Sequence, residues 1–283
     1  MPADPGPPAD PGPPADRAAT PQPGSTAADP AAVGLPAQVR ACLFDLDGVI
    51  TRTAVVHQAA WREMFDGWLD ERSRRTGHPQ QPFQDSDYAQ YLDGRSRSDG
   101  IRAFLASREV QLPDGDPSDG PDAQTVYGLG ARKDGLLKQR LQRDGVEVYP
   151  DCLHYLDAVR AAGLHTAVVS SSANTATVLQ VTGLSGRFEA RIDAQAATQQ
   201  HLQGKPAPDM FLAGAAALGL SAQQAVVFED AEAGVAAGHA GRFALVVGVD
   251  RTAPSSGHAE ALRERGASLV VRALTDLVPA GRR

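Results

Sequence analysis

The chain is poor in several features that define specialised classes of protein. Its 283 residues include only two cysteines, Cys42 and Cys152, without metal-ligand spacing, which fits reduced thiols in a cytoplasmic protein better than a disulfide framework. No run approaches about eighteen apolar residues, which argues against a membrane span. Lys and Arg form no concentrated block and the net charge is −7, which argues against nucleic acid as the main partner. A hydrophobic content of 42% nevertheless suffices for a substantial core.

Proline is abundant only at the start of the chain. Residues 1–38 contain 11 of the 21 prolines and repeat Ala-Asp-Pro-Gly-Pro-Pro at 3–8 and 9–14. This segment lacks the basic start and apolar stretch of a secretory signal, and its prolines disfavour helix and sheet. The sequence therefore predicts a disordered tail over residues 1–38.

The rest of the chain alternates between apolar runs and helical stretches. Helical spacing is found at 151–162 and 209–218, and the apolar runs that follow the one before Asp45 lie at 165–170, 225–228, 244–249 and 268–271. Such alternation predicts an α/β fold, a Rossmann-like, doubly wound parallel sheet with helices on both faces. Ligands of such sheets bind outside the carboxyl ends of the strands.

A helical pattern with polar interruptions replaces this alternation between residues 57 and 145. We expect an α-helical cap at 57–145, inserted into an α/β core made of 39–56 and 146–283. Because the insert begins ten residues after Asp47, it can close over the strand ends as a lid that excludes water.

Two aspartates, Asp45 and Asp47, end the first apolar run and precede Gly48. Residues two apart on a strand point to the same face, so both carboxylates can converge on one metal or phosphate. In different surroundings, one can act as nucleophile and the other as acid or base. Taken alone, the segment could also be a surface turn.

Three further segments accompany this pair in a fixed order. The four segments are Asp45-Leu46-Asp47-Gly48, residues 168–172 (Val-Val-Ser-Ser-Ser), 204–209 (Gly-Lys-Pro-Ala-Pro-Asp) and 228–231 (Phe-Glu-Asp-Ala). In this order they resemble the haloacid dehalogenase superfamily, and most closely its β-phosphoglucomutase group, over about residues 40 to 275. The resemblance implies that Asp45 is the nucleophile that becomes an aspartyl phosphate and that Asp47 is the acid/base.

The same resemblance implies a Mg²⁺ site. Asp45, the backbone carbonyl of Asp47, Glu229 and Asp230 would supply hard oxygen ligands. The alternative for Glu229 and Asp230 is that they cap the following helix.

Ser170, Ser171 and Lys205 are the remaining candidates in the core. Ser170 and nearby backbone N–H groups can hold phosphate oxygens, with Ser171 beside it as a substrate contact, whereas a plain helix cap is the competing explanation and is equally good for Ser172. Lys205 would neutralise charge on the phosphoryl group and on Asp45, unless it is merely a solvated lysine.

The resemblance also continues into the insert, through 51–61 and 92–100. It implies that Arg97 holds a second, non-transferring phosphate through its planar guanidinium. It places substrate contacts at Thr53, His57, Trp61, Gly94, Lys133 and Asn174. Taken singly, His57 and Trp61 could be packing neighbours one helical turn apart, and Arg97 a solvated residue in a turn.

These features imply an isomerase that interconverts β-D-glucose 1-phosphate and D-glucose 6-phosphate through the aspartyl phosphate and bound glucose 1,6-bisphosphate. A Mg²⁺-dependent phosphatase of small sugar phosphates is the nearest alternative, and a non-catalytic interaction protein is the second. Arg52 and Gly100 depart from the group's pattern and leave the fine sugar specificity open. A small site under a lid leads us to expect a monomer.

Overall fold

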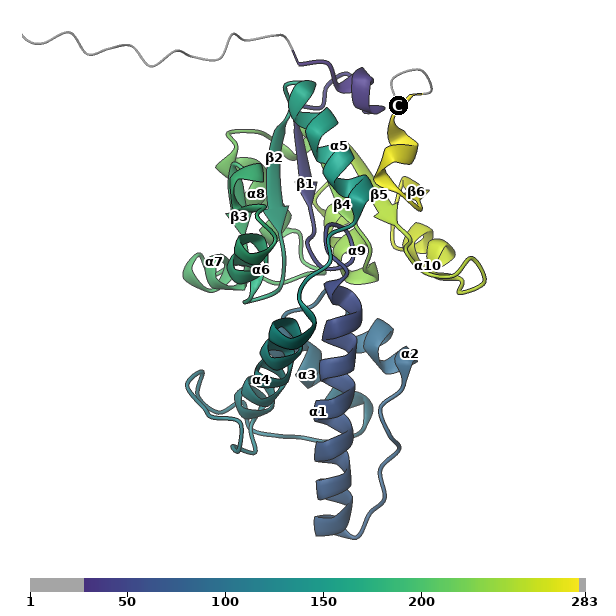
Figure 1. Cartoon of the computed structure of the whole chain (residues 1–283). Helices are drawn as coiled ribbons and strands as arrows, with labels where there is room; N and C mark the ends of the chain where they lie inside the picture. Colours follow the sequence, from purple (N-terminus) through teal and green to yellow (C-terminus); the bar gives the residue numbers. More distant parts are fainter. Residues whose placement is uncertain (1–27, 280–283) are drawn as a thin grey trace, which may run out of the picture.

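A six-stranded parallel sheet forms the centre of the molecule. The computed structural model describes residues 28–279, and its sheet has the strand order β3-β2-β1-β4-β5-β6 (Figure 1). The strands are β1 (Ala41–Phe44), β2 (His165–Val169), β3 (Ala190–Ile192), β4 (Ala225–Glu229), β5 (Leu245–Val249) and β6 (Leu269–Val271). All five neighbouring pairs are parallel, which confirms the predicted α/β fold.

Strand β1 shows why the apolar runs become central strands. All four of its residues are buried, and successive side chains point to opposite faces. Cys42 and Phe44 join the core on one face, whereas Ala41 and Leu43 join the core on the other. A strand covered on both faces has a continuous apolar sequence, which is the pattern found in the sequence.

The helices of the α/β core cover both faces of this sheet. One face packs against η1 (Pro30–Val33), α5 (Pro150–Ala161), α6 (Thr175–Val181) and η5 (Leu274–Leu277), and the other against α8 (Asp209–Ala217), α9 (Glu232–Ala240) and α10 (His258–Glu264). The shorter elements η3 (Ser185–Arg187), α7 (Ala194–Gln199) and η4 (Ala222–Gln224) lie in the connections. The predicted helices at 151–162 and 209–218 are confirmed to within one residue at each end.

A separate body of helices lies beyond the carboxyl ends of the strands (Figure 1). It contains α1 (Thr53–Thr76), α2 (Asp85–Asp87), η2 (Tyr88–Leu92), α3 (Arg97–Ser107) and α4 (Val126–Asp144), and we call residues 53–144 the helical insert. Its own core is rich in aromatic side chains: Trp61, Phe65, Trp68, Phe83 and Phe104. The insert starts at Thr53, four residues before the predicted boundary, because Thr53 already begins α1.

Two details of the sequence prediction were wrong. Strand β3 was not predicted, since three residues with Arg191 at their centre give no apolar run. The predicted disordered tail extends too far, because residues 30–33 form η1 and Val33 and Leu35 are buried in the core of the α/β unit. Apolar side chains at these two positions outweigh the effect of the neighbouring prolines. Residues 1–27 of the predicted tail lie outside the described residues.

None of the helices within residues 28–279 is long and apolar enough to cross a membrane. Both cysteines are buried and unpaired.

Candidate active site

Asp45 lies directly after β1 and is paired with Lys205. The Lys205 ammonium donates to Asp45 Oδ1 at 2.5 Å and to Glu229 Oε1 at 3.0 Å, and it also donates to the carbonyl of Val169. Lys205 is only 1% exposed. Burial lowers its pKa, but the two carboxylates outweigh this effect and raise the pKa above its ordinary value. Lys205 is therefore a buried, paired positive charge at the end of the sheet and not a solvated side chain.

Asp47 lies in different surroundings from Asp45. Its Oδ1 accepts a hydrogen bond from the Thr53 hydroxyl at the start of α1, and its Oδ2 accepts one from Ser170 Oγ at 3.3 Å. Burial, only partly offset by these hydroxyls, raises the pKa of Asp47 above its usual value. The turn after Asp47 requires glycine, because Gly48 has φ +95° and an added Cβ would lie 1.7 Å from Asp230 Oδ2. Asp47 is therefore held between the core and the insert.

Oxygen atoms of Asp45, Glu229 and Asp230 lie within 4.8 Å of one another. Burial raises the pKa of Asp45 to about 6 and that of Glu229 to about 8, and it also raises the pKa of Asp230 well above its usual value. Repulsion from neighbouring carboxylates adds to each shift, from Asp47 for Asp45 and from Asp45 for Glu229 and Asp230, and Lys205 offsets the shifts only in part. A cluster of hard oxygen donors with excess negative charge fits Mg²⁺ well.

The opposite end of the pocket is basic. Lys133, on α4, is 3% exposed; its Nζ lies 3.2 Å from His57 Nδ1 and 4.9 Å from the centre of the Trp61 ring. Burial and the charge of Arg97 lower the pKa of Lys133 to about 7. Burial and the Lys133 charge hold the pKa of His57 well below its ordinary value, so the imidazole is neutral. A bound anion would stabilise the protonated lysine at this place.

Arg97 and Asn174 lie at the same basic end but come from different bodies. Arg97 begins α3 of the insert, whereas Asn174 precedes α6 of the α/β core. Both donate to Asp134 Oδ1, each at 2.9 Å. A second bridge joins the two bodies, since the Ser171 hydroxyl donates to the carbonyl of Gly94 at 2.8 Å.

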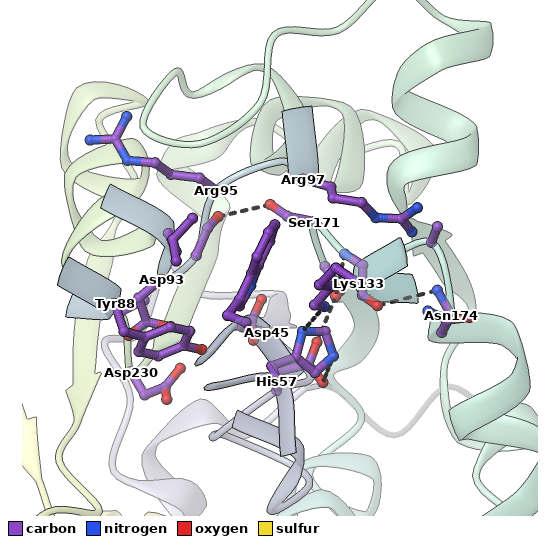
Figure 2. Close-up of a pocket in the computed structure, with 18 residues that line it drawn as sticks. Asp45, His57, Tyr88, Asp93, Arg95, Arg97, Lys133, Ser171, Asn174 and Asp230 are labelled. Atoms are coloured by element: carbon purple, nitrogen blue, oxygen red, sulfur yellow. Dashed lines mark hydrogen bonds and ion pairs between the residues drawn. The ribbon is translucent and has the colours of Figure 1, made fainter. Parts of the chain in front are cut away.

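One pocket connects the acidic and basic ends. Figure 2 shows Tyr88, Asp93 and Asp230 on one side of it and Arg97, Lys133 and Asn174 on the other. It is lined by every predicted site residue except Thr53, Lys205 and Glu229, which lie behind it and contact its acidic groups. The open space is about 60 Å³, enough for only a few water molecules. This free space is smaller than a hexose phosphate.

The contacts distinguish between a functional and a purely structural role for several of the predicted residues. Ala231 occupies the N-cap of α9, so Glu229 and Asp230 are not its caps. Arg97 is ion-paired rather than solvated. Trp61 is both a packing residue of the insert core and a pocket residue. Ser172 likewise combines both interpretations, because it lines the pocket and its Oγ accepts from the backbone N–H of Asn174.

Sequence reasoning missed several pocket residues. Tyr88, Asp93 and Arg95 line the pocket, and His258 Nε2 lies 2.7 Å from the carbonyl oxygen of Asp230. Asp93 directly precedes Gly94, but no spacing rule distinguishes it from an ordinary turn residue. Arg52, which departs from the group's pattern, pairs with Glu147 and does not line the pocket.

Known proteins of one family are similar to this chain in sequence and in fold. The family model described as haloacid dehalogenase-like hydrolase matches residues 39–242. A β-phosphoglucomutase of Mycobacterium bovis is 52% identical over 247 residues, which cover 87% of this chain and 94% of the relative. One of Bacillus subtilis is 30% identical, with 84% and 92% covered. The crystal structure of a β-phosphoglucomutase from Clostridium difficile has a TM-score of 0.65 at 25% identity, with 84% and 93% covered.

Proposed function

Because the chain belongs to the haloacid dehalogenase-like hydrolase family and, within it, to the β-phosphoglucomutase group, we propose that it interconverts β-D-glucose 1-phosphate and D-glucose 6-phosphate. The protein is then an isomerase that moves a phosphoryl group between two oxygens of one sugar. The observation that carries this proposal is the single pocket with an acidic and a basic end. Such a pocket can hold a sugar with one phosphate at the reacting end and another at the anchoring end.

Asp45 is the nucleophile. One of its carboxylate oxygens attacks the phosphorus of glucose 1,6-bisphosphate, the bond from phosphorus to the sugar oxygen breaks, and an aspartyl phosphate forms. Lys205 donates to Asp45 Oδ1 at 2.5 Å and can neutralise charge that develops on the transferring group. Ser170 is positioned to hold a phosphoryl oxygen.

Asp47 is the general acid and base. It donates a proton to the sugar oxygen as the bond to phosphorus breaks, and it takes a proton from the sugar hydroxyl that attacks in the reverse direction. Its raised pKa favours the first of these steps, because some of the carboxyl is then protonated at the start. Thr53 and Ser170 keep it oriented between the two bodies.

Asp45, Glu229 and Asp230, with the carbonyl of Asp47, are the proposed Mg²⁺ ligands. When bound, the ion supplies positive charge that stabilises the phosphoryl group during transfer.

The basic end anchors the phosphate that is not transferred. Arg97 provides planar, bidentate donors, Lys133 a buried ammonium and Asn174 an amide. The contacts proposed for the sugar are His57, Trp61, Gly94 and Ser171. Thr53, expected from the sequence as a further contact, lies behind the pocket and acts on the sugar through Asp47. In the next step the aspartyl phosphate gives its phosphoryl group to the free 6-hydroxyl of β-glucose 1-phosphate, and the bisphosphate that forms reorients to present its other phosphate to Asp45.

The insert is the proposed cap, and the division of the chain into cap and α/β core is part of this proposal. The free space beneath the insert is about 60 Å³ and holds only a few water molecules, which a bound sugar would displace. Exclusion of water favours transfer to a sugar hydroxyl over hydrolysis of the aspartyl phosphate. Small sugar phosphates as substrates and two unpaired cysteines support a cytoplasmic location, and a small site covered by the insert supports a monomer.

The decisive experiment supplies β-glucose 1-phosphate, Mg²⁺ and a trace of glucose 1,6-bisphosphate, and measures glucose 6-phosphate and free phosphate separately. We expect glucose 6-phosphate to be the main product and the bisphosphate to shorten the lag before steady turnover. Dominant release of phosphate, with no response to the bisphosphate, would identify a phosphatase instead.

A further inference from the structure

Asp134, on α4, connects Arg97 of α3 with Asn174 of the α/β core and does not itself line the pocket. Its Oδ1 accepts from Arg97 of α3 and from Asn174 of the α/β core, each at 2.9 Å. Its Oδ2 accepts from Lys138, one turn further along α4, at 2.7 Å. Arg97 and Asn174 face the pocket, whereas Asp134 does not. The carboxylate therefore lies behind the two groups that would meet a ligand.

The donors of Arg97 and Asn174 are only partly used by these contacts. A guanidinium has five N–H donors and an amide group has two. Arg97 spends one on Asp134 and one on the carbonyl of Gly130, at 3.4 Å, and Asn174 spends one on Asp134. Each side chain thus keeps donors for an anion in the pocket while its orientation is fixed from behind.

Asp134 is suited to this role in its ionised form. Burial tends to raise its pKa, but Arg97, Lys138 and Asn174 outweigh burial and hold the pKa below its ordinary value. The side chain is 16% exposed. A charge-assisted hydrogen bond restrains an arginine more firmly than a neutral one does.

We propose that Asp134 is a positioning residue that assembles Arg97 of the insert and Asn174 of the α/β core into one binding site for the second phosphate. The inference rests on the proposed function and goes beyond it, because it explains how an anion site divided between two bodies acquires a defined geometry. Without Asp134, each donor would have to be ordered by the ligand itself, at a cost in conformational entropy.

Calorimetric titration of the full chain with glucose 6-phosphate tests this role. We expect Asp134→Ala to weaken binding about tenfold, which corresponds to the loss of a charged hydrogen-bond partner. Asp134→Asn keeps the oxygen that faces Arg97 and Asn174, and should lose clearly less than Asp134→Ala. Asp144→Asn is the matched control on the same helix, because Asp144 pairs only with exposed Arg143, away from the pocket, and binding should not change.

A double-mutant cycle distinguishes positioning from a general structural effect. If Asp134 acts through Arg97, adding Asp134→Ala to Arg97→Ala should weaken binding by much less than tenfold further. Asp134→Ala could weaken binding equally in the wild-type and Arg97→Ala proteins, or could fail to weaken it where Arg97→Ala does. Either result would overturn the role of Asp134 and leave the proposed second phosphate site intact. No loss from Arg97→Ala itself would overturn the proposed second phosphate site and the role of Asp134 with it.

Discussion

The two aspartates of the reacting end are only two residues apart but have different partners. Asp45 contacts the fixed charge of Lys205, whereas Asp47 contacts the hydroxyls of Thr53 and Ser170. A carboxylate beside a cation is suited to nucleophilic attack, and one held by hydroxyls in a buried place is suited to exchanging protons. The proposed division of labour between them therefore depends on neighbours from three separate segments.

Substitutions at these two positions should have different consequences. Asp45→Asn should reduce isomerisation by about 10⁴-fold or more, because the amide oxygen is a poor nucleophile. Asp47→Asn should also impair isomerisation, by about 10² to 10⁴-fold, since the proton transfer is lost. Acetyl phosphate has a leaving group that needs no acid, so Asp47→Asn should still gain the mass of one phosphoryl group in intact-protein mass spectrometry. Phosphorylation of Asp45→Asn under the same conditions would show that another residue is the nucleophile.

The buried carboxyl groups of the proposed metal site make the stability of the folded chain depend on pH. The raised pKa of Glu229, about 8, means that the folded chain keeps a proton that the unfolded chain releases near 4.5. The stability from this proton is complete below about pH 4.5 and is lost as the pH rises towards 8. The raised pKa of Asp45, about 6, also stabilises the folded chain at acid pH, and this stability is lost as the pH rises towards 6. The lowered pKa of His57 has the opposite effect on stability at acid pH, because the buried imidazole resists protonation.

Mg²⁺ requires these carboxyls in their charged form. We therefore expect the rise in melting temperature on adding Mg²⁺ to be larger at pH 7 than at pH 5.5, measured by calorimetry. Asp230→Asn should abolish most of this rise at both values. An equal rise at both values, or one that survives Asp230→Asn, would place the metal elsewhere.

At the scale of elements, the N-terminal ends of α1 and α3 bring the insert's functional groups to the pocket. Thr53, His57 and Trp61 are four residues apart and lie on one face of α1. Arg97 is the first residue of α3, and the N-cap of that helix is Ser96, whose hydroxyl accepts from the N–H of Asp99. The cap fixes where α3 begins, and thereby where Arg97 leaves the backbone.

Arg97 offers a direct test of the second phosphate site. Arg97→Ala should lower kcat/KM for β-glucose 1-phosphate by about 10 to 10²-fold, the range for a lost charged hydrogen bond. Hydrolysis of a small monophosphate such as acetyl phosphate should change much less, because it has no second phosphate. Arg102→Ala is the control: this exposed arginine of the same helix pairs with Asp99 and Asp114, away from the pocket, and both rates should remain near wild type. Equal losses for the two substrates would count against an anchoring role for Arg97.

At the scale of the whole molecule, the helical insert covers the strand ends and the pocket (Figure 1). Two hydrogen bonds join the insert to the α/β core: the Ser171 hydroxyl donates to the carbonyl of Gly94, and the Asn174 amide donates to Asp134. Two chain segments connect the bodies, one at each end of the insert (Figure 1). Because the free space in the pocket is smaller than a hexose phosphate, we expect catalysis to require opening and closing around these connections.

Small-angle X-ray scattering should detect this motion. We expect the radius of gyration of the free protein to decrease when glucose 6-phosphate and Mg²⁺ are added, because the ligand contacts both bodies and favours the closed form. Arg97→Ala should contract less at the same ligand concentration. An unchanged radius in the wild-type protein at saturating ligand would contradict closure.

Local pattern made much of the fold and of the reacting end predictable. The apolar runs before Asp45 and Ser170 are buried strands, and the carboxyl ends of parallel strands meet at one edge of the sheet, so these polar groups had to be close. The same pattern did not predict β3, because this strand is too short and too polar to show a period. It also misjudged residues 30–38, where prolines concealed the two buried side chains Val33 and Leu35.

The sequence by itself determined which groups are candidates for the reaction, because Asp45, Asp47, Ser170, Lys205, Glu229 and Asp230 lie in short ordered segments at strand ends. Only the tertiary structure decided how the basic end is built. Asp134 is 37 residues from Arg97 and 40 from Asn174, on elements whose approach depends on how the insert packs against the sheet. Contacts across such separations follow no local periodicity. They arise from packing of whole helices, and so the positioning of the second phosphate site could be seen only once the two bodies were in place.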